Sequence, residues 1–83
     1  MYDMGRTSPT YRRASERIID EWKGFRRALS PEDREAFDHL MEHIRDHAAA
    51  GSNCESPDPV ESMLLSVLLE HEKRIRGMER ERR

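Results

Sequence analysis

The sequence predicts an all-α protein, either a three-helix bundle or an open arrangement of three helices that is completed by homodimerisation. Three observations support this fold class: three pairs of a capping residue followed by proline, apolar residues that recur every three or four positions, and no strand-like alternation. The pairs are Ser8-Pro9, Ser30-Pro31 and Asp58-Pro59. In each, a side chain that can accept a hydrogen bond from the first turn precedes a proline that fits the first helical position.

These starts predict helices at about 9–29, 31–50 and 59–81, in a single domain over residues 1–83 with frayed ends at 1–7 and 82–83. Each helix carries an apolar stripe that should face its neighbours. The first stripe is Tyr11, Ser15, Ile18, Trp22, Phe25 and Leu29. The second is Phe37, Leu40, Met41, Ile44 and Ala48, with Gly51 as the expected C-cap. The third is Val60, Met63, Leu64, Val67, Leu68, His71, Ile75 and Met78.

The composition suggests that one copy of the chain has a small core of its own. Only 35% of the 83 residues are hydrophobic, while 39% are charged. A chain of this length buries a modest fraction of its surface on folding, so a monomer is expected to be only marginally stable. Self-association would supply the missing contact area.

Charge is unevenly distributed along a chain whose net charge is −2. Residues 1–30 carry a net +3, residues 31–59 a net −6 and residues 60–83 a net +1. We therefore expect the acidic middle segment to lie beside the basic first segment. The negative total disfavours a general electrostatic attraction to nucleic acid or to an anionic membrane.

Nucleic-acid binding is nevertheless kept as the first alternative function, because basic residues cluster on the first helix and at the C-terminal end of the third. The candidate contacts on the first helix are Arg12, Arg13, Arg17, Lys23 and Arg27. Acidic residues interleave with them at helical spacing, and such a pattern usually forms a solvated charged face. Nucleic acid is thus the less favoured partner.

A second alternative is metal binding by three histidines of the second helix, His39, His43 and His47. Histidines four residues apart project from one side of a helix and can share an ion. The stripe turns by about 40° at every step of four residues, however, so three histidines cannot converge on one ion without a second element. We expect no bound metal and no cofactor.

Two further residues could carry chemistry. His71 interrupts the third stripe, where it is interpreted as a histidine at the edge of the core that bonds a neighbouring group. Cys54 lies in a polar loop beside Glu55, whose negative charge disfavours a reactive thiolate. No carboxylate falls at an expected core position, and no glycine-rich phosphate loop is present. We predict that the protein is not an enzyme.

Location is predicted from what the sequence lacks. Cys54 is the only cysteine, so no disulfide can form within the chain. The first ten residues contain no apolar stretch of the kind found in secretion signals, and the longest apolar runs are three residues long. We expect a cytoplasmic protein with no membrane association.

The function class predicted from the sequence is a small non-catalytic interaction or regulatory protein that acts through self-association and partner binding. The homodimer is expected to form through a second face of the third helix, because leucines four residues apart lie outside the main stripe, beside small serines and paired charges. This predicted interface consists of Ser62, Leu65, Ser66, Leu69, Glu72 and Arg76. The identity of any further protein partner is not written in the sequence.

Overall fold

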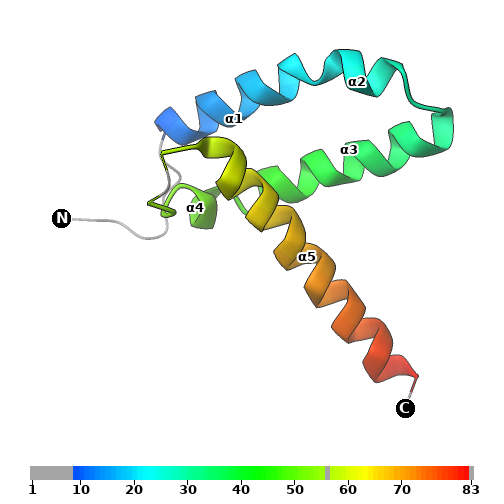
Figure 1. Cartoon of the computed structure of the whole chain (residues 1–83). Coiled ribbons are helices and arrows are strands. Elements are labelled where there is room, and N and C mark those ends of the chain that lie inside the picture. Colours follow the sequence, from blue (N-terminus) through cyan, green and yellow to red (C-terminus); the bar gives the residue numbers. More distant parts are fainter. Residues whose placement is uncertain (1–8, 56, 83) are drawn as a thin grey trace.

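The computed structural model describes residues 9–55 and 57–82. Within these ranges the chain forms five helical segments, shown in Figure 1. They are α1 (Pro9–Glu21), α2 (Lys23–Arg27), α3 (Pro31–Asp46), α4 (Ala48–Gly51) and α5 (Pro59–Glu81). The prediction of an all-α protein with three main helices is confirmed, since α2 and α4 are short continuations of α1 and α3.

The predicted helix starts agree with the structure. Ser30 is extended, and its hydroxyl oxygen accepts a hydrogen bond from the backbone N–H of Asp33 at 3.2 Å. Asp58 is also extended, and its carboxylate accepts from the N–H of Val60 at 3.0 Å. Helix α1 begins at Pro9, whereas the proposed cap Ser8 lies outside the described residues.

The prediction of one uninterrupted helix over 9–29 is wrong at Trp22. The N–H of Trp22 is shared between the carbonyl oxygens of Ile18 and Ile19, each at 3.1 Å, which loosens the regular ladder at that turn. The second segment then ends at Arg27, two residues early. There the guanidinium of Arg34 donates to the carbonyl of Arg27 at 3.0 Å and so satisfies a helix-end acceptor.

The predicted helix over 31–50 is likewise divided, at His47. This residue has φ −101° and ψ 17°, outside the helical range, although its N–H still reaches the carbonyl of His43. Its imidazole lies against Glu70 of α5, which places the bend where the chain meets that helix. The expected C-cap Gly51 is the last residue of α4, and no described glycine has a positive φ.

Position 51 requires a glycine for a different reason, because the side chain of Tyr11 approaches its backbone closely. A Cβ atom added to it would lie 2.7 Å from the hydroxyl oxygen and 2.9 Å from Cζ of Tyr11. Both distances are shorter than van der Waals contact, so the tyrosine ring packs where an alanine methyl group would be. This contact joins α4 to the first turn of α1.

A small core forms where α5 crosses the other helices. Its buried apolar side chains are Ile18, Phe37, Met41, Ile44 and Met63. Met63 is the only large apolar side chain of α5 that is buried, and it is completely inaccessible to solvent. The core is therefore built mainly by α3, which supplies three of these side chains, while α1 and α5 supply one each.

Two bidentate ion pairs tie the hairpin formed by the first three helices. Arg26 of α2 holds Asp38 of α3 at 2.8 and 2.9 Å, as expected for a basic first segment beside an acidic middle segment. The second pair has the opposite polarity, since Arg45 of α3 binds Glu16 of α1 at 2.7 and 2.9 Å. The net charges of the two segments thus predicted that they lie side by side, but they did not predict which residues form the ion pairs.

The molecule is flat, with principal extents of 44 × 38 × 17 Å. The α1–α2 and α3 hairpin forms one arm of a V, and α5 runs away from it as the other arm, ending at the C-terminus (Figure 1). The arrangement is open rather than a closed bundle, which settles the alternative that the sequence had left between the two. No helix among the described residues has the length and apolar character needed to cross a membrane.

Candidate functional site

The most unusual surface of the chain is the exposed apolar side of α5. Six large apolar side chains of this helix are between 47% and 62% exposed: Leu64, Leu65, Leu68, Leu69, Ile75 and Met78. Scattered single leucines are ordinary on a protein surface, but six large apolar side chains exposed along one helix make this surface a candidate contact site. We refer to these six residues as the α5 apolar face.

The sequence prediction for this helix is partly wrong. Val60, Met63 and Val67 do pack toward the core, as expected for the third stripe. Leu64, Leu68, Ile75 and Met78 belong to the same predicted stripe but are exposed. Leu64 borders the open groove beside the hairpin, whereas Ile75 and Met78 belong to the end of α5 that projects from the other helices. His71 is exposed as well.

Part of the α5 apolar face has the spacing of a coiled-coil seam. Leu64, Leu68, His71, Ile75 and Met78 follow one another at intervals of four, three, four and three residues. Such an alternation keeps one stripe facing a partner helix over several turns. This spacing is visible in the sequence. It also fits packing within one chain, and the sequence analysis interpreted it in that way.

The structure exposes some residues of the predicted dimer interface and buries others. Leu65 and Leu69 are exposed, as the prediction required. Ser62 and Ser66 are buried, with 3% and 5% of their surface exposed, so their expected position on an open face is corrected. Together with Gly51 and Ala50 of α4 they line a small hollow of about 80 Å³. The small side chains of Ser62 and Ser66 thus allow α5 to lie close to α4 of the same chain.

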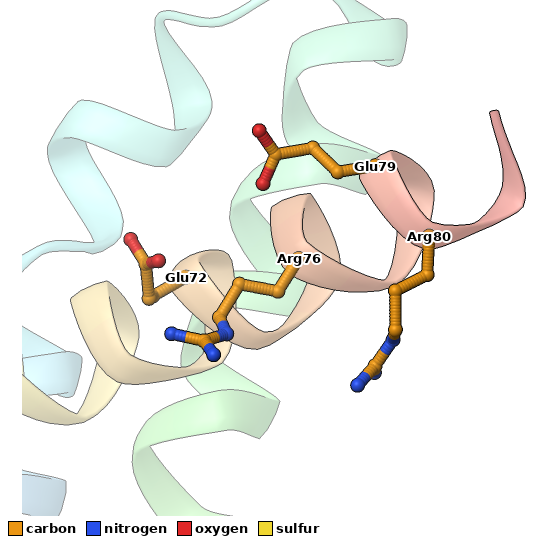
Figure 2. A pocket seen from close by; sticks show the side chains of 4 residues that line it. All are labelled: Glu72, Arg76, Glu79 and Arg80. Carbon is orange, nitrogen blue, oxygen red and sulfur yellow. The ribbon is translucent and has the colours of Figure 1, made fainter. Parts of the chain in front are cut away.

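The other two interface residues, Glu72 and Arg76, lie on the part of α5 that projects from the body. With Glu79 and Arg80 they line a shallow hollow of about 250 Å³ on this helix. Figure 2 shows Glu79 and Arg80 pointing to different sides of the helix. The hollow offers charges of both signs and suits ion pairing with another surface.

An apolar groove lies inside the V, between the hairpin and α5. Its volume is about 370 Å³, and its lining consists of Trp22, Phe25, Phe37, Leu40, Met41, Ile44, Leu64 and Val67. Phe25 is 62% exposed although its ring lies 5.7 Å from that of Phe37. Because Leu64 belongs to both, the groove is continuous with the α5 apolar face.

The three histidines proposed as metal ligands have three different environments. His39 is exposed near Glu42 at 3.5 Å, His43 is buried against the ring of His71, and Nε2 of His47 lies 3.0 Å from Glu70. In the described part of the chain, no group of three or more His, Cys, Asp or Glu side chains is arranged to hold a metal ion. Metal binding by this chain stays untested.

Glu70 is the centre of an ion-pair cluster at the point where α5 leaves the body. Its carboxylate lies within hydrogen-bond distance of His47 at 3.0 Å, and it accepts hydrogen bonds from Arg74 at 3.0 Å and Lys73 at 3.2 Å. These partners, His47 first, lower the pKa of Glu70 to about 2. A carboxylate held ionised in this way can keep His47, Lys73 and Arg74 together at this point of α5.

The basic residues proposed for nucleic-acid contact are exposed on α1 and α2, but acidic neighbours accompany several of them. Arg17 pairs with Glu21 at 3.5 Å, and Lys23 pairs with Asp20. The backbone carbonyl of Arg27 accepts from Arg34, while the remaining candidates Arg12 and Arg13 are exposed on α1. Nucleic-acid binding through these residues stays a prediction.

Comparison with known proteins identifies the family of the chain. A family model described as Domain of unknown function (DUF8156) matches residues 4–83, so the chain belongs to this family. No curated protein and no solved structure matches it.

Proposed function

We propose that this member of the DUF8156 family is a non-catalytic helical protein that acts by self-association, and that the α5 apolar face is the surface through which it forms a homodimer. The observation that carries the proposal is the set of six large apolar side chains exposed along one helix. A second copy brings an identical face, so a two-fold contact can bury apolar side chains of both copies at once.

The energetics favour such a contact. Moving one leucine, isoleucine or methionine side chain out of water contributes roughly 1.5–3 kcal/mol when burial is complete. The six side chains are about half exposed already in the monomer, so their burial recovers a substantial part of that amount. For a small domain whose described residues include a cluster of five buried apolar side chains, this gain is comparable with a typical total stability of about 5–15 kcal/mol.

The chemistry of the remaining surface supports a role in binding. Glu70 is fixed by three partners, and the single cysteine, Cys54, is exposed in the loop between α4 and α5. The apolar groove has a volume of about 370 Å³, and its lining residues include no carboxylate, histidine or cysteine to act on a substrate. An apolar hollow of this kind accommodates side chains of another helix.

The proposal is tested by the mass of the native chain in solution, measured by light scattering over a range of concentrations. The native chain should have the mass of a dimer, and Leu68→Glu should have the mass of a monomer with unchanged helical circular dichroism. Ala36→Glu is the matched control, because Ala36 is exposed on α3 and receives the same charge. A native chain that stays monomeric at high concentration contradicts the proposal.

A second variant locates the interface on the helix. Leu65→Glu combined with Leu69→Lys alters the side of α5 opposite the groove while leaving the net charge unchanged. If this double variant dissociates as Leu68→Glu does, both sides of α5 are enclosed in the dimer. If it remains dimeric, the contact is restricted to the side of Leu64, Leu68, Ile75 and Met78.

A further inference from the structure

Helix α5 uses different sides for the contact within its own chain and for its exposed coiled-coil spacing. Met63 and Ser66 are buried against the other helices, and Glu70 on the same side reaches His47 at 3.0 Å. The five side chains with coiled-coil spacing lie on another side of the helix and are all exposed. We refer to these five as the α5 seam: Leu64, Leu68, His71, Ile75 and Met78. A second helix can therefore pack along the α5 seam without displacing Met63 from the core.

We propose that two copies of the chain pair through the α5 seam as a parallel coiled coil in which the two helices are in register. This inference rests on the proposed self-association and specifies its orientation. Each residue of the α5 seam then meets the same residue of the second copy, across a two-fold axis that runs between the helices. Both hairpins lie at the end of the coiled coil where α5 begins, and the two C-terminal ends lie together.

His71 favours the parallel orientation. It is the only polar residue of the α5 seam and lies in its middle. In a parallel pair it meets the partner's His71, and one imidazole can donate a hydrogen bond to the other. In an antiparallel pair alternate seam positions face each other, so each imidazole would be covered by the partner's Leu68 or the partner's Ile75, which offer no hydrogen bond. A single polar residue in a coiled-coil seam sets the register at a cost in stability.

The charges that flank the α5 seam are complementary in the parallel orientation. In a parallel coiled coil, the residue just before one seam position lies near the partner's residue that is five positions later and just after the next seam position. Arg74 directly precedes Ile75, and Glu79 directly follows Met78. Both charged side chains are exposed. The two-fold axis therefore brings Arg74 of each copy to the partner's Glu79 and forms two ion pairs.

The antiparallel orientation offers Glu79 no such partner. Residues that follow seam positions would then face each other, and in this helix they are Leu65, Glu72 and Glu79, none of which is basic. Figure 2 shows Glu72 and Glu79 on one side of α5 and Arg80 on another. Like charges, or a charge and a leucine, would meet along this flank.

Arg74 is positioned for the contact by its own chain. Its Nε atom donates a hydrogen bond to Glu70 at 3.0 Å, which holds the side chain along the helix. A guanidinium group carries five N–H donors, so its remaining N–H groups can reach a second carboxylate. The charge complementarity between Arg74 and Glu79 thus identifies the occupant of the α5 seam as a second copy of this chain, in the parallel orientation.

Disulfide cross-linking between full-length chains tests the orientation. The chains carry Cys54→Ser, so that their only cysteine is the one introduced by Met78→Cys in the α5 seam. In a parallel pair in register the two new cysteines meet, whereas in an antiparallel pair they lie at opposite ends of the contact. Arg80→Cys in the same background is the matched control, because it lies two residues away on a different side of the helix. Masses are first measured by light scattering under reducing conditions, and oxidation is carried out at concentrations where both variants are dimers.

A charge exchange tests the contact between Arg74 and Glu79. Arg74→Glu alone places two carboxylates at each contact, and Glu79→Arg alone places two guanidinium groups there, so each should raise the dissociation constant about tenfold. An equimolar mixture of the two variants restores opposite charges at both contacts and should regain the native dissociation constant. Arg80→Glu makes the same change of charge away from the α5 seam and should keep the native value. Helical circular dichroism of each variant checks that the chains are folded.

The parallel arrangement predicts nearly complete cross-linking through position 78, little through position 80, and recovery of affinity in the mixture. Dimers that cross-link through position 78 no better than through position 80, or a mixture that regains no affinity, overturn the parallel arrangement and leave self-association intact. A native chain that is monomeric at high concentration overturns both proposals.

Discussion

The imidazole rings of His43 and His71 meet edge to face, with their centroids 6.1 Å apart and their planes at 90°. His43 belongs to α3 and is 7% exposed, while His71 belongs to α5 and is exposed. The contact lies beside the Glu70 cluster, where side chains of α5 meet His43 of α3 and His47. Protonation at this junction should therefore affect how α5 is held.

The first prediction concerns the stability of the native chain in mildly acidic solution. Burial lowers the pKa of His43 below its ordinary value of 6.5, and the positive charge of Arg74 acts in the same direction. Glu70 and Asp46 oppose this shift, while His71 adds to it. The unfolded chain thus takes up the proton at a higher pH than the folded chain does. The contribution of the neutral His43 side chain to the free energy of unfolding is fully present well above pH 6.5. It decreases as the pH falls below that value.

The urea midpoint should accordingly decrease between about pH 7 and about pH 5. In His43→Gln this decrease should be smaller, because the side chain no longer titrates. His39→Gln is the matched control, since His39 is exposed on the same helix, and it should keep the native profile. A native profile in the His43 variant would show that other groups control stability in this range.

The second prediction concerns Glu70 at lower pH. Its folded pKa of about 2 lies below its ordinary 4.5, so the folded state favours the carboxylate. The stability that it contributes is present above pH 4.5 and is lost as the pH falls toward 2. Glu70→Gln should therefore melt at a lower temperature than the native chain near neutral pH, and the two melting temperatures should converge in strong acid. Glu79→Gln, an exposed change on the same helix, should produce a smaller difference; equal effects would contradict the assignment of Glu70 as the centre of the cluster.

The helix starts could be predicted because they are local. A side chain such as Ser30 or Asp58 acts on a backbone N–H two or three residues away, and the following proline removes a donor, so no distant contact is involved. The breaks at Trp22 and His47 could not be predicted in this way. The His47 bend coincides with a contact to Glu70, which is 23 residues distant, and short-range spacing contains no information about that approach.

The candidate site was predicted only in part for a related reason. Periodicity identifies which side chains share a helix face, but it does not say how far along the helix a neighbour extends. Ile75 and Met78 continue the stripe of the packed Val60 and Val67, yet they are exposed because this end of α5 extends beyond the hairpin. Ser62 and Ser66 were expected on the open face of the dimer interface, but they are buried and line a small hollow beside α4 of the same chain.

The third prediction concerns Tyr11, whose hydroxyl group is buried without a hydrogen-bond partner in the described part of the chain. Burial raises the pKa of this phenol, as does the nearby Cys54. Leaving a polar group buried and unsatisfied costs about 1–3 kcal/mol. Tyr11→Phe should therefore be neutral or stabilising by up to about that amount, measured as a higher urea midpoint.

Gly51→Ala provides the opposite test at the same contact. Its new methyl group would lie within 2.7 Å of the Tyr11 hydroxyl oxygen, so the ring must move and the chain should be destabilised. Combining Gly51→Ala with Tyr11→Phe removes the shortest clash but leaves Cζ at 2.9 Å. The double variant should recover only part of the loss. Full stability of Gly51→Ala alone would show that the ring does not pack as described.

The fourth prediction separates the core of one copy from the contact between copies by comparing Met63 with Leu68. Both are large apolar residues of α5, but Met63 is completely buried whereas Leu68 is 62% exposed. Met63→Ala removes core contacts and leaves a cavity, at a cost of about 2–5 kcal/mol, which is a large part of the stability of a small domain. The urea midpoint of this variant should be lower at every protein concentration.

Leu68→Ala should behave differently, because its side chain contributes little to the core of its own chain. At concentrations low enough for the native chain to be monomeric, its urea midpoint should equal that of the native chain. At higher concentrations the native midpoint should rise through mass action, since dimerisation stabilises only the folded state, and the midpoint of Leu68→Ala should rise less. A loss of stability in Leu68→Ala that is the same at all concentrations would mean that this leucine is buried within its own chain, and the α5 apolar face would then not be the surface that joins two copies.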